Sequence, residues 1–176
     1  MTAVALKRSW ALDLDNKTLY QLLELRVQVF VVEQACPYPE LDGRDLLVET
    51  RHFWLEQDGR AVCSLRLLEE HETGSTSFRI GRLCTAAPAR GQGHATRLLR
   101  AALAEVGEAP CRIKAQTYLV DMYAQHGFTP EGEEFVEDGI PHVPMWRGGG
   151  AARVAGGGAA RVAGELAEPD PSSSGR

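Results

Sequence analysis

The stretch PARGQGHATRLL, residues 88–99, places Gly91 and Gly93 directly before a run of residues with helical spacing. A helix N-terminus is usually capped by a Ser, Thr, Asp or Asn side chain, and no such residue precedes this helix. The two glycines leave the first backbone amides bare at the positive end of the helix dipole, and Arg90 adds a cationic side chain. Free amides in this position form an anion site. The stretch therefore predicts binding of a phosphate group, in particular a pyrophosphate.

Two widespread phosphate-binding patterns do not describe this turn. Thr96 occupies the third glycine position of GxGxxG, and no Gly-Lys-Ser/Thr follows. Neither a dinucleotide fingerprint nor a Walker loop is therefore predicted. The ligand must be identified from the elements around the turn.

Hydrophobic periodicity around the turn predicts a mixed α/β domain. Asn16 is expected to cap the first helix, Asp58-Gly59 to close a hairpin, and Gly127 to end the last helix. The expected order is β-α-β-β-β-α-β-α-β-β, with parallel strands joined by the central crossover. The predicted elements are an edge strand within 4–14, a helix at 17–33, a loop with one short helical turn at 35–48, strands at 52–57, 60–69 and 78–85, a helix at 92–106, a strand at 111–116, a helix at 119–128, and two short strands around a turn within 135–146.

Composition excludes several classes of protein. The chain has 176 residues and a formal net charge of −5, and it shows no cluster of lysines and arginines, so a nucleic-acid partner is not expected. No apolar run has the length of a membrane span, and the first residues lack the apolar core of a signal peptide. We therefore expect a cytoplasmic protein with no membrane partner.

The cysteines do not suggest a metal site. Cys36, Cys63, Cys84 and Cys111 are far apart in the sequence and form no CxxC pair. The last three lie in apolar, strand-like runs, where cysteine acts as a small core residue. No bound metal is predicted.

The composition changes abruptly near residue 148. GGGAARVA occurs twice in succession, at 148–155 and 156–163, and Leu166 is the one large apolar residue of the segment. Such a segment cannot bury enough apolar surface to offset the entropy lost on ordering. We therefore predict one domain over 1–147 and a disordered Gly/Ala-rich tail over 148–176.

Three features, in sequence order, resemble the GNAT acyltransferase superfamily. Residues 90–95, RGQGHA, have the RxxGxA form of its coenzyme A pyrophosphate loop, and residues 123–128, YAQHGF, are similar to the YxxxGF that ends its next helix. Gln116 stands where many members carry an asparagine, so a side-chain amide is kept. A narrower resemblance, to the ElaA family, covers about residues 10–147 and depends on LRVQVFVVEQ at 25–34 and EDGIPH at 137–142.

The resemblance implies a GNAT-type mixed β-sheet with flanking helices and an N-acetyltransferase. In such enzymes a primary amine attacks the thioester of acetyl-coenzyme A directly, in a ternary complex. The expected acceptor is a small-molecule or peptide amine, and assembly as a homodimer stays open. The residues that the resemblance assigns to the cofactor are Leu83, Cys84, Thr85, Arg90, Gly91, Gln92, Gly93, His94, Ala95, Thr96 and Gln116.

Tyr123 is the predicted general acid. A phenol with a pKa of about 10 stays protonated at neutral pH and can donate its proton to the departing thiolate. Cys84 is expected to act through its backbone and not as a nucleophile, because the sequence offers its thiol no neighbouring base.

The general base is less clearly defined. Glu33 is the predicted catalytic base, as a buried carboxylate at the end of the first helix that lines the acceptor pocket. His52, His142 and a water relay are alternatives. Glu40 and Asp42, in the loop that follows, are candidates for binding a cationic acceptor.

Two other functions use the same features. A non-catalytic acyl-coenzyme A sensor would keep the loop without turnover, although the presence of Tyr123 disfavours it. An acyl-homoserine lactone synthase shares the fold and an R-x-x-V-F string like Arg26-Val-Gln-Val-Phe30, but such enzymes generally lack the RxxGxA loop.

Overall fold

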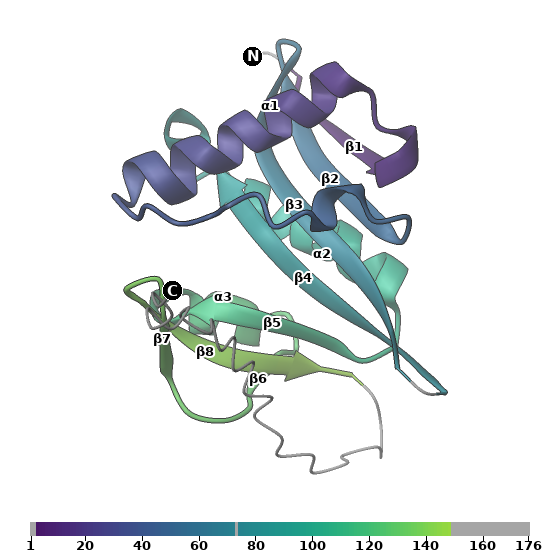
Figure 1. Cartoon of the computed structure of the whole chain (residues 1–176), viewed down its shortest axis with the longest axis vertical. Helices are drawn as coiled ribbons and strands as arrows, with labels where there is room; N and C mark the ends of the chain where they lie inside the picture. Colours follow the sequence, from purple (N-terminus) through teal and green to yellow (C-terminus); the bar gives the residue numbers. More distant parts are fainter. Residues whose placement is uncertain (1–2, 73, 149–176) are drawn as a thin grey trace, which may run out of the picture.

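A computed structural model describes residues 3–72 and 74–148 of the chain. Within them, helices flank both faces of a mixed β-sheet, as the sequence predicts (Figure 1). The predicted disordered tail with its GGGAARVA repeat lies outside the described residues, apart from Gly148, and stays a prediction.

The sheet of the described residues has the strand order β1-β2-β3-β4-β5-β8-β6, and β7 pairs with β8. Every pairing is antiparallel except that of β4 with β5, which confirms the predicted parallel crossover. The strands are β1 Ala5–Trp10, β2 Thr50–Gln57, β3 Arg60–Glu72, β4 Ser75–Thr85, β5 Cys111–Gln116, β6 Thr129–Pro130, β7 Phe135–Glu137 and β8 Ile140–Arg147.

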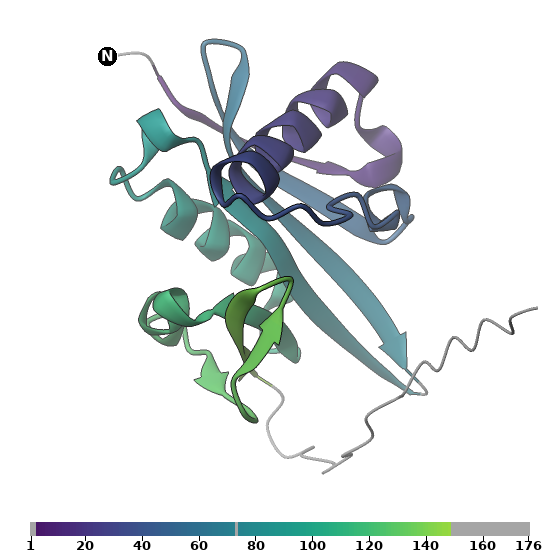
Figure 2. The same cartoon turned by 60° about the vertical axis from the view of Figure 1, so that its left-hand side comes forward.

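The two long helices cover opposite faces of the sheet (Figure 2). One core cluster joins Leu98 and Leu99 of α2 to Leu65 and Leu67 of β3, and a smaller one joins α1 and the segment after it to β4. We call these faces the α2 face and the α1 face. The helices are α1 Asn16–Arg26, α2 His94–Val106 and α3 Val120–Ala124; η2 Val27–Glu33 is π-helical, and η1 Ala11–Asp13, η3 Arg44–Leu46, η4 Ala87–Ala89 and η5 Thr117–Leu119 are 3-10 turns.

The first helix differs from its prediction at both ends. Asp15, and not Asn16, is the N-cap, because its carboxylate accepts hydrogen bonds from the backbone N–H of Thr18 at 3.0 Å and from its hydroxyl at 2.6 Å. These hydrogen bonds hold the pKa of Asp15 below its usual value. At the other end the α-helix stops at Arg26, and the chain continues to Glu33 in π-helical turns. Such turns concentrate at functional sites.

At a bulge in β4, the side chains of the strand switch from one face of the sheet to the other. Phe78 and Ile80 belong to the α2-face core, whereas Cys84, which plain alternation would place beside them, packs against Leu25 and Val29 on the α1 face. The register of β3 against β4 shifts in this segment, and Arg82 adopts a φ of +54°. One extra residue in one strand reverses the faces of the side chains that follow and bends the strand.

Beyond its first residues, β4 separates from β5. Their ladder consists of Phe78 opposite Cys111 and Arg79 opposite Arg112, and it does not continue toward the bulge. Figure 1 shows the two strands converging at one end and apart at the other. This separation positions the site described below.

A buried ionic network joins α1 to the loop before β2. The Arg26 guanidinium contacts Glu40 at 2.7 Å and Asp45 at 2.5 Å, and all three side chains are almost fully buried. Arg66 binds Asp42 through two hydrogen bonds of 2.6 and 2.7 Å and lies 3.1 Å from Asp45. Although burial by itself raises the pKa of Asp45, the hydrogen bonds and charge of Arg26 outweigh it and lower that pKa.

We predict that Arg26→Met costs about 3–5 kcal/mol of unfolding free energy, because Glu40 and Asp45 stay buried without their counter-ion. Urea denaturation monitored by circular dichroism measures the change. The loss should shrink as the pH approaches the range where free carboxyls protonate, since a neutral carboxyl needs no counter-ion. The control is Arg60→Met at an exposed position outside the network, for which we expect a change within about 0.5 kcal/mol. Equal losses in the two variants would contradict the prediction.

Candidate functional site

A cavity of about 880 Å³ opens where β4 and β5 separate. Its walls come from η2, the loop at 36–44, β4 beyond its ladder with β5, the turn before α2, β5, α3 and the β7–β8 hairpin. The cavity thus reaches both faces of the sheet.

The turn before α2 has the conformation that its sequence predicts. Gly91 and Gly93 have φ values of +73° and +74°, a region that favours glycine, and no side chain caps the helix. A Cβ built on Gly93 meets no atom within 4 Å, so the backbone faces open space. The first amides of a 13-residue helix therefore face the cavity without an internal partner.

Arg90 is fixed beside this turn. Its Nε donates a hydrogen bond to the Thr85 carbonyl oxygen at 3.0 Å, and its guanidinium forms an ion pair with Glu33 at 2.6 Å. The pair connects the end of the η2 helix to the loop that precedes α2. The positive charge of Arg90, which the sequence offers to a phosphate group, is thus already paired with a carboxylate.

Glu33 is not the buried carboxylate that we expected. It is exposed at the mouth of the cavity, and its hydrogen bonds to Arg90 lower the pKa of its carboxyl. A carboxylate that accepts hydrogen bonds from a guanidinium is a weaker proton acceptor. The contact favours a role for Glu33 in orienting Arg90 over a role in proton transfer.

The structure brings the predicted cofactor residues to one place. Gln92 is the exception: its side chain is exposed and it is absent from the cavity wall. The predicted residues that line the cavity are Glu33, Leu83, Cys84, Thr85, Arg90, Gly91, Gly93, His94, Ala95, Thr96, Gln116 and Tyr123.

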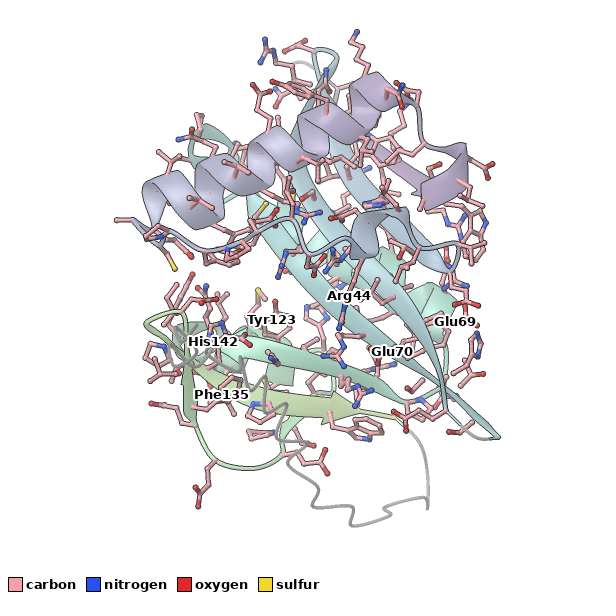
Figure 3. All side chains as sticks on the ribbon, in the orientation of Figure 1. Arg44, Glu69, Glu70, Tyr123, Phe135 and His142 are labelled. Carbon is pink, nitrogen blue, oxygen red and sulfur yellow. The ribbon has the colours of Figure 1, made fainter. Side chains whose placement is uncertain are left out.

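Tyr123 lies at the wide end of the opening between β4 and β5 (Figure 3). The ring packs edge-on against Phe128, with centroids 6.0 Å apart, and the residue is 7% exposed. Burial raises the pKa of its phenol well above the usual value. The group therefore stays protonated throughout the neutral range and can act as a proton donor.

Cys84 does not have the environment of a nucleophile. Burial raises the pKa of its thiol to about 12, which keeps it protonated at neutral pH. Among the described residues all four cysteines are buried and free, and no group of His, Cys, Asp or Glu side chains could hold a metal ion. None of the helices described here combines the length and the apolar character needed to cross a bilayer.

The structure also changes the interpretation of three residues proposed from the sequence. His52 is 2% exposed, donates through Nε2 to the Asp45 carbonyl oxygen at 3.0 Å, and has its pKa lowered by burial, so it belongs to the core. Glu40 and Asp42 are engaged by arginines and are not free to bind a cationic acceptor.

Several arginines of the cavity region were missed in the sequence. Arg66 and Arg82 line the cavity and bind the acidic loop at 40–45, and Arg82 also lies over the Tyr38 ring at 5.9 Å. A signal was present: Arg26 and Arg66 interrupt apolar runs, and a charged residue in a buried run implies a buried partner. The partners themselves are too distant in sequence to be recognised.

Comparison with known proteins identifies the family. A family model described as an acetyltransferase (GNAT) domain matches residues 22–147. The chain belongs to the GNAT acetyltransferase family. A UPF0039 protein of Mycobacterium tuberculosis is 71% identical to it over 146 residues, which are 82% of this chain and 94% of that protein. Protein ElaA of Escherichia coli is 35% identical over 139 residues, 77% of this chain and 90% of ElaA, which confirms the ElaA resemblance.

Solved structures agree with this assignment to the GNAT family. An acyl-CoA N-acyltransferase from Pseudomonas aeruginosa has a TM-score of 0.78 and 38% identity, covering 82% of this chain and 99% of that one. Escherichia coli ElaA has a TM-score of 0.75 and 32% identity, with the same coverage. The AHL synthase LasI, with a TM-score of 0.65 and 16% identity over 83% of this chain and 90% of LasI, shares the fold alone. Membership of the GNAT family supports an acyltransferase that uses an acyl-coenzyme A as co-substrate.

We predict that Gly93→Val weakens binding of acetyl-coenzyme A at least a hundredfold, because the branched side chain would enter the space in front of the free amides. At this positive φ the substitution also strains the backbone, by about 1–2 kcal/mol. The matched control is Gly59→Val, which has nearly the same φ, +73°, and open space around its Cβ, but lies outside the cavity. Calorimetric titration should give normal affinity for the control and at least a hundredfold loss for Gly93→Val. Normal affinity in both variants would refute the assignment of the loop.

We predict that Glu33→Gln keeps kcat within a few-fold of the unchanged protein. Its affinity for acetyl-coenzyme A should stay equal or rise by up to about fivefold, since the substitution removes an exposed negative charge beside a phosphate site. Steady-state kinetics and titration measure both quantities, with exposed Glu24→Gln on α1 as the control. A fall in kcat of about 10²–10⁴, with unchanged cofactor affinity, would instead assign the proton transfer to Glu33.

Proposed function

We propose that this protein is an N-acetyltransferase that transfers the acetyl group of acetyl-coenzyme A to a primary amine by direct attack in a ternary complex. The observation that carries the proposal is the cavity itself. It joins, in one continuous space, free amides at a helix N-terminus, the unpaired edge of β4 and a buried phenol. The amides suit the diphosphate of the cofactor, the edge of β4 suits its pantetheine arm, and the phenol suits the thioester.

The diphosphate would bind to the amides that follow Arg90. Backbone donors at a helix N-terminus bind phosphate through fixed dipoles. Because Glu33 already compensates Arg90, most of the attraction is expected from the backbone and not from side-chain charge. The net charge of −5 fits this arrangement, since a chain with a negative net charge can bind an anionic cofactor only through a local anion site.

The pantetheine arm would lie along β4. Past Arg79 this strand has no ladder with β5, so the backbone of Leu83, Cys84 and Thr85 lines the cavity. An extended amide chain can hydrogen-bond to such an edge as an added strand would. A backbone N–H in this stretch is also the natural donor to the oxyanion that forms when an amine attacks the thioester. Gln116 lines the cavity from β5, and its side-chain amide forms a hydrogen bond with that of Gln34 at 3.4 Å.

Tyr123 would supply the proton that the leaving thiolate needs. The buried residue belongs to the same core as α2, and therefore lies on the side of the sheet where the cofactor proposed at the start of α2 would bind. No hydrogen bond to another described side chain holds its proton. The raised pKa keeps it a proton donor throughout the neutral range.

We predict that Tyr123→Phe lowers kcat by about 10²–10⁴ and leaves the Kd of acetyl-coenzyme A nearly unchanged. The substitution keeps the ring and its contact with Phe128 but removes the acidic proton. Tyr20→Phe, at a position 69% exposed on α1, is the matched control and should behave as the unchanged protein. A kcat within a few-fold of the unchanged protein would leave Tyr123 with a packing role only.

The function itself is tested by measuring thiol release from acetyl-coenzyme A in the presence of an amine panel: alkyl amines, polyamines, amino acids and peptide N-termini. Mass spectrometry should identify the acetylated product. Binding of acetyl-coenzyme A without product from any amine would support the acyl-coenzyme A sensor instead. Thermal stabilisation by S-adenosylmethionine would favour a lactone synthase-like enzyme.

A further inference from the structure

The attacking amine must lose a proton, and one side chain of the cavity is arranged to take it. Of the histidines among the described residues, His94 and His142 line the cavity. His94 begins α2, and its Nε2 is buried with no hydrogen-bond partner among the described residues, so this nitrogen is not open to the cavity. His142 lies on β8, half-buried, and faces the opening.

The hydrogen bond of His142 defines its tautomer. Nδ1 lies 2.8 Å from the carbonyl oxygen of Ile140. A carbonyl oxygen can only accept, so Nδ1 carries the hydrogen and donates it. In the neutral ring Nε2 then holds the free lone pair, which is the state required of a general base.

Packing fixes the plane of the ring. His142 stacks on Phe135 of β7, with centroids 5.8 Å apart and an interplanar angle of 27° (Figure 3). The two residues are directly opposite each other in the β7–β8 ladder, and Gln116 is opposite His142 in the β5–β8 ladder. Directly opposed residues share a face of the sheet. The stack on Phe135 and the hydrogen bond to the Ile140 carbonyl therefore hold the imidazole in one orientation.

This face is the one opposite Tyr123. Ile113 and Ala115 of β5 belong to the α2-face core that includes Tyr123. Because side chains alternate along a strand, Gln116 and hence His142 lie on the α1 face. The contact of Gln116 with Gln34, which directly follows η2, agrees with this placement. An acid and a base on opposite faces suit a reaction in which thiolate leaves toward one side and amine arrives from the other.

Resting on the acetyltransferase function proposed above, we propose that His142 is the general base for the acceptor amine. As the amine nitrogen forms its bond to the thioester carbon, Nε2 takes one proton from that nitrogen. When the carbon–sulfur bond breaks, Tyr123 gives its proton to the thiolate. The imidazolium then loses a proton to solvent and the phenolate gains one, which restores both groups.

The charged groups near His142 are mostly compensated. Lys114 on β5 lies over the Phe135 ring at 5.4 Å and pairs with Glu137 on β7 at 2.5 Å. Glu33, on the η2 side, pairs with Arg90. Asp138, in the turn between β7 and β8, lines the cavity and forms no ion pair among the described side chains. Its carboxylate favours the approach of a cationic or polar amine from this side.

The test is His142→Asn, which keeps a side-chain N–H for the Ile140 carbonyl but has no nitrogen that accepts a proton. We expect kcat to fall by about 10²–10⁴ and the Kd of acetyl-coenzyme A to stay within about twofold. His126→Asn, a histidine outside the cavity, is the matched control.

Each other outcome overturns the assignment. A variant that keeps kcat shows that water or another group takes the proton, while the acetyltransferase function stands. A parallel loss of kcat and acetyl-coenzyme A affinity, repeated in His142→Gln, shows that the ring only supports the site. If the unchanged protein acetylates no amine of the panel, the proposed function fails, and the role of His142 fails with it.

Discussion

The separation of β4 from β5 creates the cavity and determines which groups line it. In a continuous sheet the backbone groups of neighbouring strands satisfy each other, and no space remains between them. Here the parallel ladder ends after Phe78 and Arg79, and the bulge at Arg82 turns the remainder of β4 away. Arg82 holds a φ of +54°, which is strained for a residue with a side chain, and strain of this kind concentrates at functional sites.

Two features stabilise the sheet on its two faces where β4 and β5 separate. On the α1 face, three arginines from the first helix, β3 and β4 bind the carboxylates of the loop at 40–45 and fix the wall of the cavity. Arg82 belongs both to the bulge and to the ionic network, because the bulge directs its guanidinium toward Glu40 at 2.9 Å. On the α2 face, the apolar core continues from α2 to Tyr123 across the gap.

The ionic network also explains why the cavity offers so little free charge. Arg66, Arg82, Arg90 and Lys114 each have a carboxylate within 3 Å. We therefore expect recognition of a cofactor and an acceptor to depend on directed polar groups: backbone amides and one phenol as donors, and one imidazole as an acceptor. Such groups discriminate by position and not by long-range attraction, which salt would screen.

The order of elements, apart from the two-residue strand β6, could be predicted from the sequence, as could the Asp58-Gly59 hairpin, the glycine turn before α2 and the GNAT resemblance. Each of these depends on residues close together in the chain. Local chemistry decides which residues cap, turn or leave an amide bare. The sequence analysis missed Asp15 as the cap, since neighbouring Asp and Asn compete for one position. It also missed the π-helical turns at 27–33, since tertiary packing selects the wider helix.

The partners of the charged groups, by contrast, follow from the tertiary fold. Glu33 meets Arg90 across 57 positions, and Arg26 meets Asp45 across 19, so no spacing rule could pair them. The same holds for the face on which a side chain lies. One extra residue in β4 reverses Cys84, and the ladder between β5 and β8 places His142 opposite Gln116. Residue types are properties of the sequence, whereas the proton affinity of a group and the direction of its side chain depend on the neighbours that folding supplies.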